Sequence, residues 1–216
     1  SFIVRMADSR EGYEIVRVPL IPRGTGGYVG MILNYLSFIA AGMSWGPRLL
    51  RGRHFDIIFV YGTSPIFQGF VGSFLKRRLG ARLVLWVQDL WPHALAATGF
   101  FRNRRILAAV EALVKRLYRQ ADLILAQSEG FASIINGQAS GRPVEVFPNP
   151  GEVVDPALLA GSWTNTGPFE VVFAGNLGRA QALDTVIEAA AMLGDLPDVR
   201  ITLYGSGAME DWIRQQ

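Results

Sequence analysis

The stretch V-V-F-A-G-N-L-G-R-A-Q-A-L-D, residues 171–184, decides the expected fold. An apolar, β-branched run ends at Gly175, a short polar turn carries Arg179, and an apolar pattern of helical period follows. This order predicts a strand, a tight turn and a helix N-terminus, which is how an α/β protein presents backbone N–H groups to a phosphate. A plain strand-to-helix turn with an exposed arginine would show the same pattern.

A second copy of the pattern follows at once. Val199–Tyr204 predicts a strand, and it ends at Gly205 in the run Gly-Ser-Gly. Two successive strands that end in glycine turns at one sheet edge predict a nucleotide diphosphate site. In such a site Gly175 would let the backbone approach the ligand, the Asn176 amide would donate a hydrogen bond, and Arg179 would pair with phosphate oxygens in a bidentate way.

The composition limits the classes of function. Half of the 216 residues are hydrophobic and the mean hydropathy is +0.24, which suits a chain with a substantial core. The net charge of +3 and the pI near 9.5 suit anionic partners such as sugar nucleotides or an anionic membrane face, but do not indicate nucleic acid. The absence of cysteine and the presence of two histidines argue against thiol catalysis and against a thiolate or histidine-rich metal site.

Strand and helix patterns alternate along the chain, which predicts a parallel sheet with helices on both faces. We expect strands at 14–20, 55–61, 82–87, 123–126, 144–147, 169–174 and 199–204, and helices at 28–45, 66–79, 103–120, 129–135 and 182–192. The shift to Gly, Pro, Ser, Thr and Asn predicts a linker at 151–168 between a domain at 1–150 and another at 169–216. Because residue 1 is not Met and 208–216 reads as the beginning of a helix, we expect a piece of a longer protein, incomplete at both ends.

The motif W-V-Q-D-L-W-P, residues 86–92, follows a predicted strand and lies where open α/β sheets bind ligands. Asp89 would orient a sugar hydroxyl or accept a proton, Gln88 lies beside it, and Trp91 would stack on a sugar ring. The same motif would also arise if the aspartate capped a short helix and the tryptophans lay in the core. His93 follows the motif, and a lone histidine is more often structural than catalytic.

Two further segments have open interpretations. Asn149, in P-N-P before the linker, either contacts a ligand in a cleft or forms a simple turn. Tyr28–Trp45 contains 18 residues without a charge, so it is a membrane span, a buried core helix or a shallowly inserted helix. Neighbouring arginines would meet anionic lipid headgroups or simply face solvent; they are Arg23, Arg48, Arg51 and Arg53.

Together these motifs resemble a retaining GT-B glycosyltransferase of family 4, in the bacterial branch of colanic-acid and fucosamine transferases that builds surface polysaccharides. The resemblance covers nearly the whole chain and rests on the motifs at 22–28, 56–66, 86–92, 118–128, 148–150, 174–184 and 204–207. It implies two Rossmann-like domains, the first missing its beginning and the second truncated. It also implies that the acceptor binds the N-terminal domain and that a UDP- or GDP-linked sugar binds the C-terminal domain.

The resemblance also implies roles for single residues. Gly175, Asn176 and Arg179 would lie near the donor diphosphate, Gly205 near the nucleotide, and Asp89 near the transferred sugar. Many family members have Arg at the position of Asn176, Lys at that of Gln181, and His at that of Gln88, so Arg179 is expected to supply the charge at the diphosphate. The family needs no divalent metal or other cofactor.

We therefore expect a cytoplasmic glycosyltransferase, peripheral on the inner face of the plasma membrane, that acts on a lipid-linked or polysaccharide acceptor. Two alternatives remain from the sequence. One is a nucleotide-sugar epimerase of the same architecture, and the other is a membrane-associated nucleotide-binding fragment without activity of its own.

Overall fold

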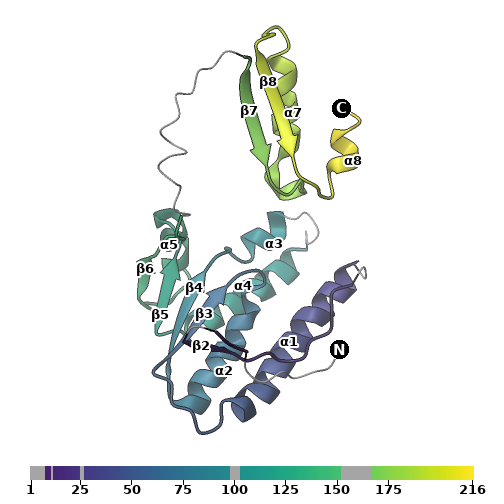
Figure 1. Cartoon of the computed structure of the whole chain (residues 1–216). Coiled ribbons are helices and arrows are strands. Elements are labelled where there is room, and N and C mark those ends of the chain that lie inside the picture. Colours follow the sequence, from purple (N-terminus) through teal and green to yellow (C-terminus); the bar gives the residue numbers. More distant parts are fainter. Residues whose placement is uncertain (1–7, 11, 25–26, 98–102, 152–166) are drawn as a thin grey trace. The chain divides into compact units, whose positions relative to one another are not determined.

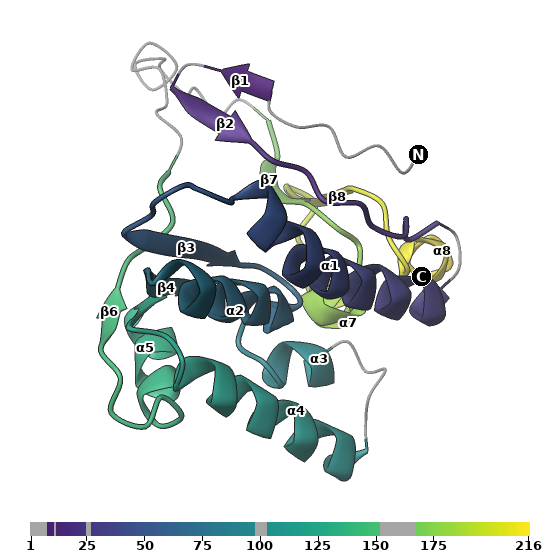
Figure 2. The same cartoon turned by 90° about the horizontal axis from the view of Figure 1, so that it is seen from below.

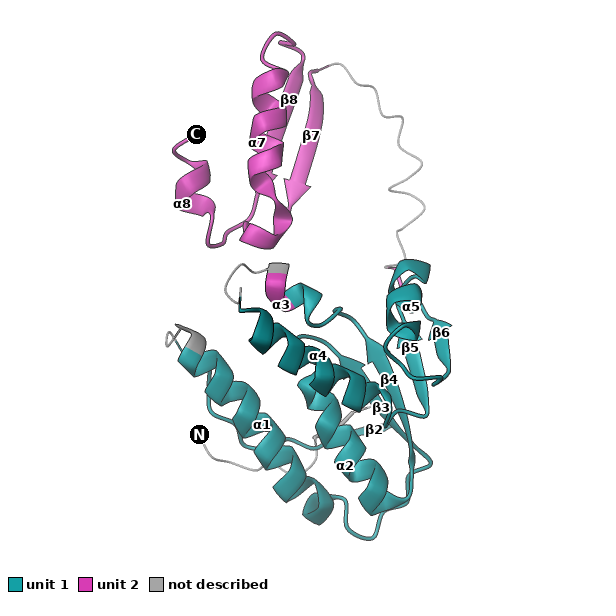
Figure 3. Cartoon of the chain, turned by 180° about the vertical axis from the view of Figure 1, so that it is seen from behind, with its two compact units in different colours: residues 1–94, 103–149 teal, residues 95–102, 150–216 magenta. Residues whose placement is uncertain are grey.

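The structure is a computed structural model that describes residues 8–10, 12–24, 27–97, 103–151 and 167–216. It divides the chain into two compact units (Figure 3). Unit 1 consists of Ser1–Ala94 with Asn103–Asn149, and unit 2 of Leu95–Arg102 with Pro150–Gln216. The predicted linker at 151–168 lies outside the described residues, except for Gly151, Gly167 and Pro168.

Unit 1 is built on a parallel sheet with the strand order β3-β4-β5-β6 (Figure 1). The strands are β3 (Ile57–Gly62), β4 (Arg82–Val87), β5 (Leu123–Ala126) and β6 (Val144–Val146). Their carboxyl ends are in register, because Gly62 pairs with Val87, Val87 with Ala126, and Ala126 with Val146. This alternation of parallel strands and helices is Rossmann-like and confirms the predicted α/β class.

Helices between these strands cover one face of the sheet. They are η1 (Ile66–Gln68), α2 (Gly69–Leu79), α4 (Arg104–Tyr118) and α5 (Glu129–Asn136). A short helix, α3 (His93–Ala97), begins in unit 1, and its residues from Leu95 on belong to unit 2. The core lies beneath the helices that cover the sheet and includes Leu83, Leu85 and Val87 of β4, Val114, Leu117 and Tyr118 of α4, and Ile135 of α5. Alternate residues of a strand point to one face, so these three residues of β4 all meet the helices. A Cβ on Gly72 would lie 2.5 Å from Val60 Cγ2, so glycine lets α2 approach the sheet.

The opposite face of the sheet differs from the prediction of helices on both faces. Trp86 lies at its centre and contacts the rings of Tyr61, Phe59 and Phe147, with centroids 5.2, 6.0 and 5.1 Å away. Phe59, Tyr61 and Phe147 are each about half exposed. The helices that the structure describes in unit 1 therefore cover the sheet from one side.

The N-terminal part also departs from the expected pattern. The strand predicted at 14–20 is limited to β2 (Tyr13–Ile15), which pairs antiparallel with β1 (Asp8–Arg10). The predicted helix 28–45 is longer, because α1 (Gly27–Leu49) continues through Pro47. A proline in the last turn removes a backbone donor without ending the helix. Figure 2 shows α1 beside α2.

Helix α1 is not a buried core helix of unit 1. Val29–Leu49 is long and apolar enough to cross a membrane by length and composition, and 6% of its most apolar window is buried. Core helices of soluble proteins have the same length and apolar composition.

Polar contacts fix the ends of the elements in unit 1. The Asn103 side chain accepts a hydrogen bond from Arg105 N, and that of Ser128 accepts one from Phe131 N, as helix caps do. Asp122 accepts from Leu83 N and pairs with Lys76 Nζ, at 2.7 and 2.6 Å. Burial would raise the pKa of Asp122, but hydrogen bonds from Lys76 and Leu83 and the positive charges of Lys76 and Arg142 hold it below its ordinary value.

Unit 2 contains the parallel pair β7 (Phe169–Ala174) and β8 (Val199–Tyr204), the bounds that the sequence predicts. The turn after β7 includes η2 (Arg179–Gln181), and α7 (Leu183–Met192) begins one residue later than predicted. The predicted C-terminal helix is α8 (Glu210–Ile213). Leu177 and Leu183 are the large buried side chains among the described residues of this unit.

Candidate functional site

Polar side chains collect at the carboxyl edge of the parallel sheet in unit 1. Each follows the end of a strand: Ser64 after β3, Gln88 and Asp89 after β4, Gln127 after β5, and Asn149 after β6. Open α/β sheets bind ligands at this edge because the strands deliver their following loops to one place. We call these five residues the edge cluster.

Asp89 is held by a short chain of hydrogen bonds. Trp91 Nε1 donates to Ser64 Oγ at 3.2 Å, and Ser64 Oγ donates to Asp89 Oδ2 at 2.6 Å. Trp91 packs edge-on against Phe67, with ring centroids 5.4 Å apart. The structure thus brings the predicted residues Asp89 and Trp91 together through Ser64, which orients the carboxylate.

A second set of hydrogen bonds joins the ends of β4, β5 and β6. Asn149 Nδ2 donates to Gln88 Oε1 at 2.9 Å and to Gln127 Oε1 at 3.2 Å, and Gln127 Nε2 donates to the backbone oxygen of Gln88. Within the described part of the chain, Gln88 Nε2 is buried and has no hydrogen-bond partner. A buried donor without a partner is costly, so this atom is suited to a ligand oxygen.

His93 does not join the edge cluster through any hydrogen bond or ion pair between described residues. It is exposed at the first position of α3. Its charge, when present, is one of the influences that lower the pKa of Glu111 on α4, after the hydrogen bond and charge of Lys115. The structure therefore places His93 within electrostatic reach of Glu111 on α4, and no hydrogen bond or ion pair between described residues joins it to Asp89.

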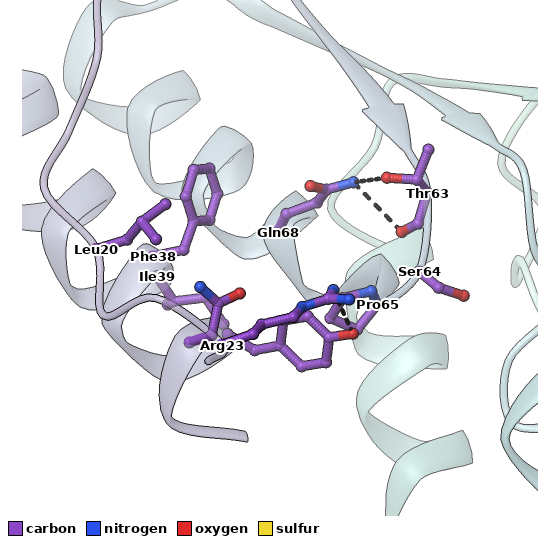
Figure 4. Close-up of a pocket in the computed structure, with 10 residues that line it drawn as sticks. Leu20, Arg23, Phe38, Ile39, Thr63, Ser64, Pro65 and Gln68 are labelled. Carbon is purple, nitrogen blue, oxygen red and sulfur yellow. Dashed lines mark hydrogen bonds between the residues drawn. The ribbon is translucent and has the colours of Figure 1, made fainter. Parts of the chain in front are cut away.

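A pocket of about 240 Å³ adjoins Ser64 in unit 1 (Figure 4). Arg23 donates from Nη2 to Tyr35 Oη at 2.7 Å, and its guanidinium lies over the Tyr35 ring, 4.9 Å from the centroid. Gln68 Nε2 donates to the Thr63 backbone and side-chain oxygens at 3.3 and 3.1 Å. One wall is apolar, with Phe38 and Ile39 from α1. A pocket with a cation, an amide and an apolar wall suits a polar ligand with an apolar part.

The sequence did not identify Ser64, Gln127, Gln68 or Tyr35 as site residues. Ser64 and Gln127 follow strands directly, so the signal that pointed to Asp89 was present for them too. Tyr35 and Gln68 lie on helices and reach the pocket only through the packing of α1 beside η1 and α2. No local pattern reports such packing.

In unit 2 the structure brings the two glycine turns together. Gly175 N donates to Tyr204 O, Leu177 N to Ser206 O, and Met209 N to Leu177 O, all at 2.9 Å. A Cβ on Gly205, whose φ is +152°, would lie 1.8 Å from the Gly175 oxygen. Only glycine permits this approach. The turns at Gly175 and Gly205 are therefore joined by backbone hydrogen bonds, and we call them together the double turn.

The other predicted donor residues lie on the same turn. Arg179 begins η2 and is exposed, and it makes no ion pair with another described residue. A Cβ on Gly178 would lie 2.5 Å from Asn176 Nδ2 and 2.8 Å from Gln181 Oε1, so both side chains fold over Gly178. Asn176 and Arg179 thus flank a glycine that the sequence analysis did not single out. Among the described residues no group of three or more His, Cys, Asp or Glu is placed to hold a metal ion.

Polar side chains at the carboxyl edge of a parallel sheet, as in unit 1, and a glycine turn after a strand, as in unit 2, are each typical of Rossmann-like binding domains. Residues 5–150 match the model of the glycosyl transferase 4-like domain, so the chain belongs to that family. The match contains the whole edge cluster and ends before the glycine turns. The predicted family is thereby confirmed at this level.

The chain is also similar to a curated protein, the probable glycosyltransferase WbjE of Pseudomonas aeruginosa. The two are 23% identical over 177 residues, which is 76% of this chain and 43% of that protein. The chain therefore spans less than half the length of this relative.

Proposed function

We propose that the chain belongs to a retaining glycosyltransferase that moves a sugar from a UDP- or GDP-linked donor to a lipid-linked or polysaccharide acceptor. The pathway would be the synthesis of a bacterial surface polysaccharide, at the cytoplasmic face of the plasma membrane. Family membership and the name of the relative support the transferase class. The observation that carries the site assignment is the Trp91–Ser64–Asp89 chain of hydrogen bonds at the sheet edge.

Asp89 would act on the hydroxyl groups of the reacting sugars. Ser64 occupies Oδ2 as a donor and so fixes the plane of the carboxylate, which can accept further hydrogen bonds from a sugar hydroxyl. The buried Gln88 Nε2 is a donor in the same cluster and would bind a sugar oxygen. Trp91 is held by its bond to Ser64 and would offer its ring as a stacking surface.

The donor diphosphate would lie at the double turn of unit 2. Gly175 and Gly205 give the ligand access to the backbone, Asn176 would donate a hydrogen bond, and Arg179 would pair with phosphate oxygens. In a retaining transfer the leaving diphosphate takes the acceptor proton, while the arginine and the N-terminus of α7 stabilise its charge. The proposal includes neither a metal ion nor another cofactor.

Calorimetric titration of the 216-residue chain with UDP and GDP tests the donor site, and incubation with a labelled UDP- or GDP-sugar and polyprenyl-linked acceptors tests transfer. We expect one nucleotide to bind and labelled sugar to appear in the lipid fraction with the anomeric configuration of the donor. Arg179→Ala should weaken binding about tenfold, as loss of one charge-assisted contact does, whereas Arg214→Ala is the matched control.

Each other outcome contradicts a defined part of the proposal. No binding of either nucleotide removes the donor site, and an inverted product removes retention. If a nucleotide binds but no sugar is transferred, the result supports the alternative of an inactive nucleotide-binding fragment. If the donor sugar is epimerised when no acceptor is present, the result supports the epimerase.

A further inference from the structure

The outer face of α1 is apolar and exposed. Val29, Ile32, Leu33 and Leu36 are 68, 44, 45 and 58% exposed. Their spacing of three, four and seven residues places them on one side of the helix. Leucine, isoleucine and valine gathered in this way on a surface mark a site of contact with an apolar partner.

The inner face of α1 packs against the rest of unit 1. A Cβ on Gly42 would lie 2.7 Å from Val71 Cγ1, so α1 packs directly on α2. Asn34 Nδ2 donates to Ile21 O at 2.6 Å, and Ile21 N donates to Ser37 Oγ at 2.9 Å. A helix that crossed a bilayer would lose these contacts, and its polar groups would be left without partners in hydrocarbon. The bonded face therefore favours a helix that keeps its place on the domain.

The exposed face leads into a hollow lined by arginines at the C-terminal end of α1. Met43 and Pro47 lie seven and eleven residues after Leu36, on the same side of the helix, and both line the hollow of about 580 Å³. Its other lining residues are Ser44, Arg48, Arg51, Phe74 and Arg78. No acidic side chain lines it among the described residues. We call the exposed face and this hollow together the α1 surface.

Two of the arginines are held in position by the protein. Arg48 Nη1 donates to Ser44 O at 2.6 Å, and the Arg78 guanidinium lies over the Phe74 ring, 5.3 Å from its centroid. By contrast, Arg53 nearby is neutralised by Glu14. Three guanidinium groups beside an apolar stripe match the order of a lipid leaflet, in which anionic phosphates border hydrocarbon.

We propose that the α1 surface docks on an anionic lipid bilayer. Helix α1 lies in the plane of the interface, with Val29, Ile32, Leu33 and Leu36 in the acyl boundary, and the hollow binds a lipid phosphate through Arg48, Arg51 and Arg78. This deepens the proposed function by naming the surface that meets the membrane, and it rests on that function for the lipid-linked acceptor. Binding to vesicles needs no donor, so it can fail or succeed independently of sugar transfer.

Co-sedimentation of the 216-residue chain with vesicles tests the proposal. One set contains phosphatidylcholine alone and the other adds one third phosphatidylglycerol. We expect binding to the anionic vesicles and about 100-fold weaker binding to the neutral ones, because each of the three arginines contributes about fivefold at an anionic surface. Inorganic phosphate at 10 mM, used as a competitor of matched chemistry, should leave vesicle binding intact (the bilayer, not free phosphate, being the ligand).

Two variants separate the parts of the surface. Arg51→Gln with Arg78→Gln should weaken binding to anionic vesicles about 25-fold. Ile32→Gln with Leu36→Gln should weaken it at least about tenfold, since apolar burial is lost while glutamine suits a helix. The matched controls are on α4 and its C-cap, Arg119. Arg116→Gln with Arg119→Gln removes equal charge, Ile106→Gln with Leu113→Gln removes exposed apolar groups, and both should change binding little.

An alkaline carbonate wash distinguishes the in-plane helix from a span, because a protein bound at the interface is released and a spanning helix is not. Circular dichroism confirms that each variant is folded. The proposal is overturned if the chain does not bind anionic vesicles, if phosphate displaces it, if it resists carbonate, or if the α1 and α4 variants lose binding equally.

Discussion

Replacement of Gly205 by alanine should open the double turn of unit 2. The new Cβ would lie 1.8 Å from the Gly175 oxygen and 3.0 Å from its carbon, and φ at this position is +152°. The turn must separate to admit the methyl group, which breaks the bonds from Gly175 N to Tyr204 O and from Leu177 N to Ser206 O. Each bond contributes about 1 kcal/mol and the backbone strain about 1–3 kcal/mol, so we expect a loss of roughly 3–5 kcal/mol.

Hydrogen exchange read by mass spectrometry is the assay, because it reports on β7 and β8 separately from unit 1. The expected loss corresponds to a fall in protection of about two to four orders of magnitude across Phe169–Ala174 and Val199–Tyr204, or to complete exchange. Gly194→Ala is the control, since its Cβ would be 3.4 Å from Ala191 O, an ordinary contact. Equal protection in the Gly205 and Gly194 variants would show that the close approach of Gly205 to the Gly175 oxygen does not hold the two strands together.

Three further predictions concern single side chains. Asp122→Asn should lower the free energy of unfolding by about 1–2 kcal/mol at pH 7, a value kept small because the carboxylate is 34% exposed. The fold lowers the pKa of Asp122, so its contribution is complete above the unfolded pKa, and urea titrations should show the difference between wild type and variant disappearing as the pH falls below about 4. Tyr118→Phe should be neutral or stabilising by about 1 kcal/mol in thermal denaturation, because the buried hydroxyl has no partner among the described residues; a clear loss would reveal a partner. Gly72→Ala should cost about 1–3 kcal/mol, since Val60 Cγ2 would be 2.5 Å from the new Cβ, and an unchanged melting temperature would contradict the close approach of α2.

The elements predicted best from the sequence are those that a run of neighbouring residues specifies. Runs of β-branched and apolar residues located β4, β5, β7 and β8 with the observed bounds. The segment after Ile15 has a similar run, but β2 ends at Ile15, and the backbone of Ile21 bonds to side chains of α1. These bonds join residues far apart in the sequence, so the local strand pattern could not predict them.

The residues of the candidate site also differ in how far they could be predicted from neighbouring sequence. Asp89, Gln88 and Asn149 were predicted because they follow strands or a turn, and the structure joins Gln88 to Asn149 directly. The Ser64 hydroxyl that orients Asp89 lies 25 residues earlier, so its role depends on β3 and β4 being neighbours. His93 was named because it follows the motif, with a structural role as the commoner alternative; it begins α3, its charge acts on Glu111 of α4, and its part in the site stays a prediction.

The edge cluster is tested most directly by the rate of sugar transfer by Asp89→Asn, compared with Asp56→Asn, whose carboxylate is 93% exposed in the same unit. We expect Asp89→Asn to slow transfer about 100-fold or more while the affinity for the nucleotide stays unchanged, because the carboxylate acts on the sugar and the nucleotide binds elsewhere. Asp56→Asn should transfer sugar at the wild-type rate. If Asp89→Asn transfers sugar as fast as the wild type, the edge cluster is not the site of the reaction.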